Sequence, residues 1–195
     1  MRFPITTLRL PEWVGGFLPT PKMPYPTVED RMEIVVGLAR ENVERGTGGP
    51  FGAAIFDLET TRLVAPGVNL VVTSGLSVAH AEVLAISTAQ NVLGRFDLGG
   101  EGMPRLELVT SAEPCAMCSG AALWSGVRGL ACGARDEDAR AVGFDEGPKA
   151  PHWDRYFEER GINVVRDVLR DEATAVLNHY VERGGEIYNA RRGGS

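Results

Sequence analysis

Apolar side chains recur three or four positions apart in several segments of the chain, which is the period of an amphipathic helix. The first segment, residues 28–45, follows Thr27, and Asp30 stands three positions after that threonine. Such a pair can begin a helix as a capping box, and Gly46 is typical of a helix end. Further helices are predicted over residues 79–93, 114–124, 135–142, 152–160 and 171–183.

Shorter apolar or alternating runs separate these helices and predict β-strands. The strands are expected over residues 51–57, 62–73, 105–110, 128–132 and 162–166. The second run contains Pro66-Gly67, which predicts a break in that strand, because proline has no amide hydrogen to donate. Strands that alternate with helices indicate an α/β sheet that is covered by helices on both faces.

Both ends of the chain differ in composition from the residues between them. Residues 1–26 hold six of the twelve prolines, so we expect an extended arm. Its aromatic residues, such as Trp13 and Phe17, would pack either over the arm's own domain or against a second subunit. Residues 184–195 form a tail rich in glycine and arginine. One domain, residues 27–183, lies between these ends and shows no internal repeat.

The composition favours a globular domain that acts on a small molecule. The 195 residues are 44% hydrophobic and 24% charged, and no apolar run reaches the ~18–20 residues that span a bilayer. The first residues lack the apolar core of a signal peptide, and three cysteines do not make a disulfide framework, so we expect a cytoplasmic protein. A net charge of −6 disfavours nucleic acid as a partner, since binding it requires basic surface.

Three residues have the side chains and the spacing of a zinc site. Cys115 and Cys118 are three positions apart, and His80 lies upstream. A structural zinc site closes with a fourth protein ligand, whereas a catalytic site leaves that position to water. The remaining cysteine and the two remaining histidines have no partner at metal-ligand spacing. We therefore predict an open, catalytic zinc site.

Both predicted metal-binding segments follow a strand and begin a helix, where unpaired amides and the helix dipole stabilise the thiolates of Cys115 and Cys118. Zinc lowers the pKa of bound water toward ~7, which supplies hydroxide as the nucleophile at neutral pH. Glu82 stands two residues after His80. Its carboxylate is expected to take a proton from the water and pass it to a ring nitrogen or a leaving amine. This chemistry suits the removal of an amino group from an electron-poor heterocycle.

The motif His80-Ala81-Glu82, followed by Pro114-Cys115-Ala116-Met117-Cys118, resembles the signature of the zinc-dependent cytidine deaminase superfamily. The resemblance covers roughly residues 28–150. It implies a three-layer αβα fold around a mixed five-stranded sheet. It also implies one zinc ion per subunit, held by the histidine and the two cysteines, with Glu82 as the proton shuttle.

Within that superfamily the sequence is most similar to the bacterial guanine deaminases, which convert guanine to xanthine and ammonia. The likeness rests on Pro50-Phe51-Gly52-Ala53, Asn69, Trp124 and Phe144-Asp145-Glu146-Gly147. The resemblance implies that Phe51 stacks on the purine, that Asn69 hydrogen-bonds to its edge and that Trp124 forms a pocket wall. Glu146 is expected to recognise and protonate the departing amino group, with Asp145 as the alternative.

The same resemblance implies a homodimer whose C-terminal segment helps to close an active site. Tyr188, in the sequence Glu186-Ile187-Tyr188-Asn189-Ala190, is then the candidate lid residue. Ala81, beside the zinc ligand His80, is a further candidate for contact with the substrate. We expect a nucleobase as the substrate, and neither a membrane nor a nucleic acid as a partner.

Other functions stay open at the level of the sequence. The same chemistry would serve cytosine, a pterin, an aminotriazine such as ammeline, or an adenosine in tRNA, although the net charge of −6 disfavours tRNA. A zinc-stabilised binding module without turnover is the alternative from another class. Glu82 argues against that module, since a structural zinc site gives no reason for an acid there. If the protein has no catalytic role, Asn69 is a turn residue and Glu146 is a solvated acid in a loop.

Overall fold

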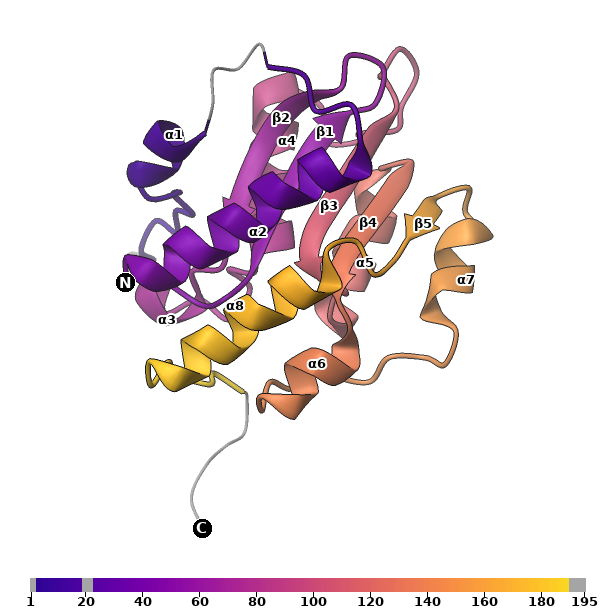
Figure 1. Cartoon of the computed structure of the whole chain (residues 1–195). Coiled ribbons are helices and arrows are strands. Elements are labelled where there is room, and N and C mark those ends of the chain that lie inside the picture. The colour runs from indigo at the N-terminus through magenta and orange to yellow at the C-terminus, as the bar shows by residue number, and fades with distance from the viewer. Residues whose placement is uncertain (1–2, 19–22, 190–195) are drawn as a thin grey trace.

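A mixed β-sheet forms the centre of the protein, whose computed structural model describes residues 3–18 and 23–189. Its strands are β1 (Gly52–Asp57), β2 (Arg62–Val68), β3 (Leu106–Ala112), β4 (Gly129–Ala134) and β5 (Asn163–Val165). They lie in the order β2-β1-β3-β4-β5, with β1 antiparallel to both neighbours and with β3, β4 and β5 parallel (Figure 1). The predicted mixed sheet of five strands is confirmed.

Helices cover both faces of this sheet, which gives the three predicted layers. The main helices are α2 (Val28–Glu44), α4 (Ala81–Leu93), α5 (Ala116–Ser125) and α8 (Arg170–Glu182). In Figure 1, α2 and α8 lie in front of the sheet, and α4 and α5 lie behind it. Side chains of β1 alternate between the two cores: Ala54 and Phe56 pack with α2, whereas Ala53 and Ile55 pack with α4.

Helix α2 begins where the sequence predicts, with reciprocal hydrogen bonds in its first turn. The Asp30 amide donates to the Thr27 hydroxyl at 3.1 Å, and the Thr27 amide donates to the Asp30 carboxylate at 2.9 Å. Gly46 follows the helix with a φ of +63°, which glycine adopts without strain. The capping box and the glycine stop are therefore confirmed.

The second strand differs from the prediction at its centre and at its end. β2 runs unbroken through Pro66 because it is an edge strand, where a proline can leave its outer side unpaired. A Cβ atom at Gly67 would lie 2.1 Å from the Ala81 carbonyl oxygen, so glycine lets α4 pack closely over the strand. β2 ends at Val68, and α3 (Val71–Ser74) comes next. Helix α4 thus follows a helical turn and not a strand.

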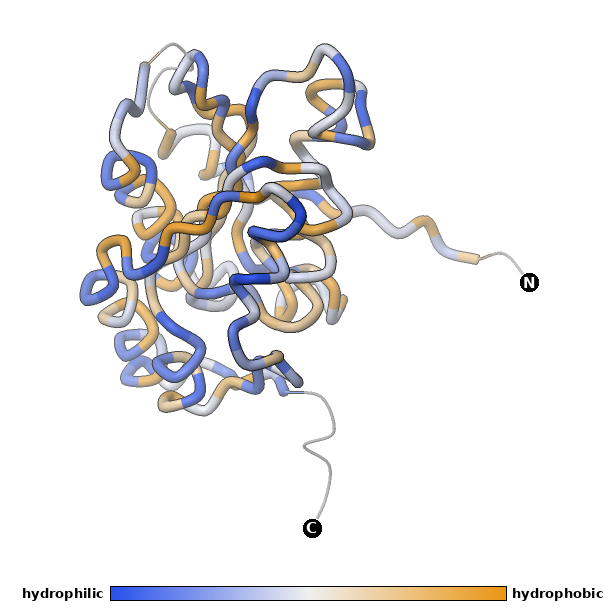
Figure 2. The backbone as a smooth tube through the Cα atoms, turned by 90° about the vertical axis from the view of Figure 1, so that its right-hand side faces the viewer, coloured by the Kyte–Doolittle hydropathy of each residue, from blue (hydrophilic) through white to orange (hydrophobic). Residues whose placement is uncertain are grey.

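The N-terminal arm contains a short helix, so the prediction of an arm extended throughout is wrong. In α1 (Trp13–Phe17), Val14 is 2% exposed and packs in one cluster with Leu38 and Leu84. Two glycines disfavour this helix in isolation, and its packing against α2 and α4 outweighs that propensity. The arm therefore lies over its own domain, and Figure 2 shows only its first described residues leading away from the body.

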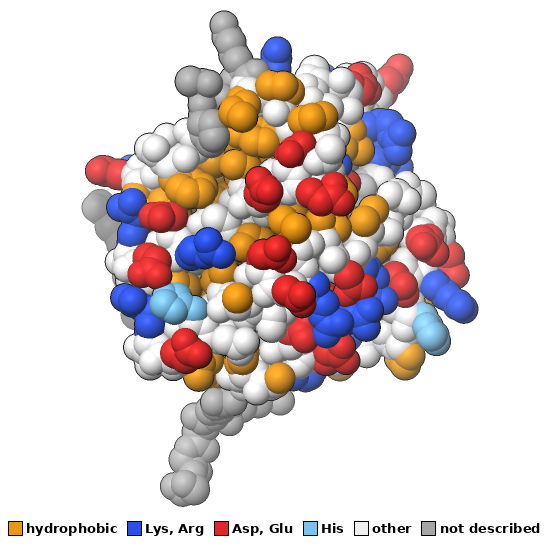
Figure 3. Space-filling model, viewed as in Figure 1, with side chains coloured by type: hydrophobic (Ala, Val, Ile, Leu, Met, Phe, Trp, Pro, Cys, Tyr) orange, Lys and Arg blue, Asp and Glu red, His pale blue; other side chains and the backbone are white. Residues whose placement is uncertain are grey.

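Two short helices follow β4, and charged side chains of both signs lie on the surface. The helices are α6 (Asp136–Ala141) and α7 (Trp153–Glu158). Acidic and basic side chains are interspersed over the face that carries α2 and α8 (Figure 3), unlike the continuous basic surface that binds phosphate backbones. No helix within residues 3–18 and 23–189 is long and apolar enough to cross a bilayer.

Candidate active site

The two sequence motifs meet where helices α4 and α5 begin. His80 is the N-cap of α4, Cys115 is the N-cap of α5, and Cys118 lies in the first turn of α5. The His80 Nδ1 atom lies 3.6 Å from Cys115 Sγ and 3.5 Å from Cys118 Sγ. All three ligand atoms lie within 4.8 Å of one another. The fold thus brings together the three predicted zinc ligands.

The spacing of these atoms fits zinc. A tetrahedral zinc ion, with bonds of about 2.3 Å to sulfur and about 2.1 Å to nitrogen, holds the two atoms roughly 3.6 Å apart. One nitrogen of His80 faces two sulfur atoms, and a single proton cannot satisfy both pairs. A cation bound by all three atoms does satisfy them. One nitrogen and two sulfurs are also the donors of catalytic zinc sites that leave a fourth position open.

The two cysteines share a proton while no metal is bound. Hydrogen bonding from the Cys118 thiol, opposed by burial and aided by His80, lowers the pKa of Cys115 to about 4. The Cys118 pKa rises well above its usual value, because its thiol donates to Cys115 and is buried. A metal that binds both sulfurs must therefore displace a proton from Cys118.

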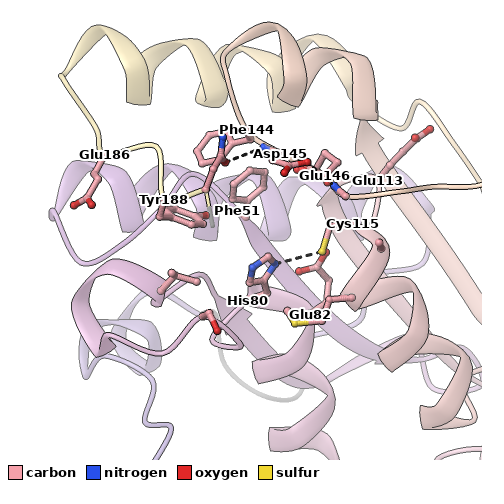
Figure 4. Close-up of a pocket in the computed structure, with 16 residues that line it drawn as sticks. Phe51, His80, Glu82, Glu113, Cys115, Phe144, Asp145, Glu146, Glu186 and Tyr188 are labelled. Carbon is pink, nitrogen blue, oxygen red and sulfur yellow. Dashed lines mark hydrogen bonds between the residues drawn. The ribbon is translucent and has the colours of Figure 1, made fainter. Parts of the chain in front are cut away.

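Glu82 lies directly beside the ligand set. It is the second residue of α4 and is 7% exposed. Burial raises the pKa of its carboxyl group, and the negative charge of Cys115 raises it further. Figure 4 shows Glu82 next to His80 and Cys115. An acid–base group therefore stands where a water molecule on the metal would need one.

A cavity of about 510 Å³ opens beside these residues. Aromatic side chains form one wall of it: Phe51 meets Phe144 edge-on with 4.9 Å between ring centroids, and Tyr188 lies 5.3 Å from Phe144. Tyr188 also lies 6.4 Å from the ring of His80 (Figure 4). Pockets for small molecules span about 300–1,000 Å³. The wall and the volume suit a flat heteroaromatic ring.

The two neighbouring acids that line the cavity after Phe144, Asp145 and Glu146, differ in burial. Glu146 is 7% exposed, and its burial, together with the charges of Cys115 and Glu82, raises the pKa of its carboxyl group to about 8. The side chain of Asp145 is 59% exposed and accepts from the Gly147 amide at 2.9 Å. Glu146 thus has the buried surroundings of an acid–base group. Asp145 instead makes a hydrogen bond within its own loop.

Asn69, a further residue expected at the substrate, does not itself line the cavity and has an unpaired amide nitrogen. Its Oδ1 atom accepts from the Val71 amide at 3.2 Å, and its Nδ2 atom is buried without a hydrogen-bond partner. The Tyr188 hydroxyl is also buried and unpaired. A Cβ atom on Gly49 would lie 2.7 Å from the Tyr188 hydroxyl and 3.1 Å from Asn69 Oδ1, so the two groups flank one point. Buried polar groups of this kind are usually satisfied by a ligand or by water.

Sequence comparison assigns this site to a known family. The family model for the cytidine and deoxycytidylate deaminase zinc-binding region matches residues 26–134. The chain belongs to this zinc-dependent deaminase family. His80, Cys115 and Cys118 are the residues of this chain that could hold the zinc ion of such a region.

Several deaminases resemble the chain over most of its length. It is 40% identical to the guanine deaminase of Bacillus subtilis over 73% of this chain and 87% of that protein. The structure of the guanine deaminase from Nitrosomonas europaea is 45% identical, with a TM-score of 0.85 over 90% of this chain and 96% of that chain. A structure of NE0047 in complex with 2,6-diaminopurine is 47% identical, with a TM-score of 0.87 over 95% and 97% of the two chains.

Besides Asn69, two residues expected at the substrate lie outside the cavity of this deaminase. Trp124 is 87% exposed and is absent from the cavity lining. The inward face of α5 carries Cys118, Ala122 and Ser125, and a residue two positions after Ala122 points to the opposite side of a helix. Trp124 therefore does not line the cavity of its own chain. Ala81 is fully buried at the start of α4, and it too does not line the cavity.

The deaminase cavity also includes a buried acid that the sequence patterns did not single out. Glu113 is 4% exposed, and its carboxylate accepts from Arg166 Nε at 2.9 Å and from Lys149 Nζ at 3.2 Å. Figure 4 shows it pointing away from His80. These pairs tie the turn before Cys115 to the segment after Glu146. In the sequence, only its position directly before Pro114-Cys115 could have indicated that Glu113 lies near the site.

Asn189 was also missed, although it stands next to the predicted lid residue. Its Oδ1 atom accepts from the Asp145 amide at 2.9 Å, and its Nδ2 atom donates to the Gly143 carbonyl oxygen at 2.9 Å. The Tyr180 hydroxyl donates to the Glu186 carbonyl oxygen at 2.8 Å. The C-terminal segment is thereby held across the cavity of its own chain. Residues 190–195 of the predicted tail lie outside the described residues.

Proposed function

We propose that the protein hydrolyses guanine to xanthine and ammonia. The observation that carries this proposal is that two buried carboxyl groups, Glu82 and Glu146, face one aromatic-walled cavity beside the zinc ligands. One acid serves the attacking water and the other serves the departing amino group. The similarity to the guanine deaminases of Bacillus subtilis and Nitrosomonas europaea supports guanine as the substrate.

Glu82 moves protons in this mechanism. When held by His80, Cys115 and Cys118, zinc supplies a Lewis acid that lowers the pKa of water. Glu82 accepts a proton from the attacking water while the water oxygen bonds to C2 of guanine, and it passes this proton to a ring nitrogen or the amine. The hydroxyl on C2 then becomes a carbonyl and gives up the second water proton, so that the ring nitrogen and the exocyclic nitrogen each gain one proton. The bond between C2 and the exocyclic nitrogen breaks, and that nitrogen leaves as ammonia. Water is the only co-reactant that this balance requires.

Glu146 recognises the amino group that leaves. Its pKa of about 8 means that the carboxyl group carries a proton at neutral pH in the metal-free chain. In that form it donates a proton to the departing nitrogen, and in the ionised form it accepts a hydrogen bond from the amino group. The largely exposed carboxylate of Asp145 is less suited to either task.

The rest of the cavity selects and covers the ring. Phe51 and Phe144 offer aromatic surface to the purine, and the Asn69 Nδ2 group has a hydrogen to donate to an acceptor on its edge. A ligand that leaves this donor unpaired pays for it in affinity. Tyr188 closes the cavity from the C-terminal side and excludes water.

We also infer that the enzyme is a cytoplasmic homodimer. Val92 on α4, Phe96 just after it and Trp124 on α5 are 64%, 87% and 87% exposed. Large apolar side chains left in water on neighbouring helices support a second copy of the chain as their cover. Light scattering on the purified protein tests this state, and a monomeric mass at micromolar concentration would contradict it.

An ammonia-release assay tests the proposed reaction. Zinc-loaded protein is incubated with guanine, guanosine, adenine, cytosine, ammeline and an adenosine-containing tRNA anticodon stem. We expect ammonia from guanine and not from guanosine, because a closed pocket for a base excludes the sugar. Turnover of cytosine or tRNA alone would replace guanine as the substrate. Ammonia from none of the six would favour the binding module without turnover.

A further inference from the structure

A chain of hydrogen bonds leads from the N-terminal arm to the base-binding side of the cavity. The Trp13 indole Nε1 donates to the Thr47 hydroxyl at 3.1 Å. The Thr47 hydroxyl donates to Asn42 Oδ1 at 2.7 Å. Asn42 Nδ2 donates to the Gly49 and Asn69 carbonyl oxygens, each at 2.8 Å. Three segments that are distant in the sequence are thus joined through the side chain of Asn42, which is 0% exposed.

The chemistry of the end groups gives this chain one direction. An indole nitrogen only donates, and a backbone carbonyl oxygen only accepts. The Thr47 hydroxyl must therefore accept from Trp13 and donate to Asn42. That arrangement fixes the amide orientation of Asn42, because Oδ1 takes the hydroxyl proton and Nδ2 keeps both hydrogens for the two carbonyls. The Thr47 hydroxyl also lies 3.4 Å from the Asn42 backbone carbonyl oxygen, but its 2.7 Å contact with Oδ1 is the shorter of the two.

The path ends on the two residues that we place against the base. Asn69 donates through its backbone amide to the Phe51 carbonyl oxygen at 3.0 Å, so the two move together. A Cβ atom on Gly48 would lie 1.9 Å from the Asn69 carbonyl oxygen and 2.8 Å from Asn42 Nδ2. Glycine is required there so that the loop can lie against the bridging amide. The loop and Asn69 are therefore positioned by one side chain.

We propose that Trp13, Thr47 and Asn42 are positioning residues that hold Asn69 and Phe51 in the geometry that binds the base. The arm thereby acquires a role in substrate binding as well as in packing. This inference rests on the proposed function, because it assigns the base to the wall that Asn69 and Phe51 form. None of the three positioning residues touches the cavity itself.

A matched pair of substitutions at Thr47 tests the proposal. Thr47→Val keeps the shape of the side chain and removes both hydrogen bonds, whereas Thr47→Ser keeps the hydroxyl. For Thr47→Val we expect KM for guanine to rise roughly three- to tenfold, as for the loss of one hydrogen bond, with kcat within about twofold. Thr47→Ser should restore the wild-type KM. A residue that only stabilises the fold would lower the urea midpoint and leave KM unchanged.

Substitutions in the arm supply a second test that does not depend on Thr47. Trp13→Phe removes the indole N–H and keeps an aromatic ring, and it should raise KM in the same direction. Val14→Ala in the same helix alters packing against Leu38 and Leu84 and removes no hydrogen bond of the path, so its KM should stay at the wild-type value. If Thr47→Val folds poorly, Trp13→Phe against Val14→Ala decides the question. A wild-type KM in both Thr47→Val and Trp13→Phe overturns the proposal.

The dissociation constant of 8-azaguanine, measured by calorimetry, separates this inference from the reaction itself. We expect the constant to rise in Thr47→Val and Trp13→Phe by the same factor as KM, and to stay unchanged in Thr47→Ser. If the wild-type protein binds 8-azaguanine but releases no ammonia from guanine, the proposed reaction is wrong. The positioning role is then decided by the dissociation constants of the variants alone. Equal affinities in all variants would contradict the positioning role alone.

Discussion

The two halves of the active site are built in different ways. The metal-binding half comes from the first turns of α4 and α5, where His80, Cys115 and Cys118 are fixed by helices that pack on the sheet. The half that we propose to bind the base, called the base-binding half below, comes from strand ends and loops, which supply Phe51 and Asn69 among others. Regular structure holds the first half, and polar contacts between distant segments hold the second. The metal-binding side chains are therefore held by packed helices. The proposed recognition of the base depends instead on individual hydrogen bonds, each of which a single substitution can remove.

Removal of the metal should have the largest effect, because it disables the first half entirely. We expect protein treated with a chelator to lose guanine turnover and to regain it with one zinc ion per chain. The two cysteines share a proton that zinc displaces, so zinc affinity should fall as the pH falls. Titration of the metal-free protein at several pH values measures this. Full turnover without metal, or an affinity that rises in acid, would contradict the zinc site.

Substitution of the buried acid in the second half should have the next largest effect. We expect Glu146→Gln to lower kcat by on the order of 10²–10⁴, as for the loss of a positioned acid or base. Asp145→Asn is the matched control, and its kcat should stay within about tenfold of the wild type because the side chain is largely exposed. Steady-state kinetics with guanine decides between them. A loss confined to Asp145→Asn would exchange the roles of the two acids.

Deletion of residues 185–195 should have a smaller effect, restricted to the base-binding half. Without Tyr188 the cavity stays open to water, and we expect kcat/KM to fall roughly ten- to a hundredfold. The urea midpoint should change less than kcat/KM, because residues 185–189, the described part of the deleted segment, lie at the edge of the core and make few hydrogen bonds to Tyr180 and to the loop after α6. Zinc content should not change. Wild-type kinetics in the shortened protein would rule out a lid.

The metal-binding half could be predicted almost completely from the sequence. The spacing of Cys115 and Cys118 and the acid two positions after His80 restrict the chemistry. Helical periodicity placed all these residues at helix starts, which the structure confirms. Such signals are local, so they survive without any knowledge of the tertiary structure.

The base-binding half was predicted only in part, since its geometry depends on long-range contacts. The Asn42 side chain donates a hydrogen bond to the Asn69 carbonyl oxygen, 27 positions away in the sequence. No local sequence pattern predicts such a contact. The burial of Glu146 and the exposure of Asp145 follow from how the loop packs, and the sequence left both acids as candidates. The exposure of Trp124 was not predictable either, because a fixed distance from Cys118 does not say which face of a helix a residue occupies.

The most direct test of the account is the turnover of metal-loaded Glu82→Gln. Glutamine keeps the shape of the side chain at the start of α4 and cannot carry the proton between water and the leaving amine. Zinc per chain and ammonia release from guanine are measured on the same preparation. We predict one zinc ion per chain, as in the wild type, with kcat lowered by at least about 10²-fold. Wild-type kcat at full zinc occupancy would contradict the claim that Glu82 moves the proton.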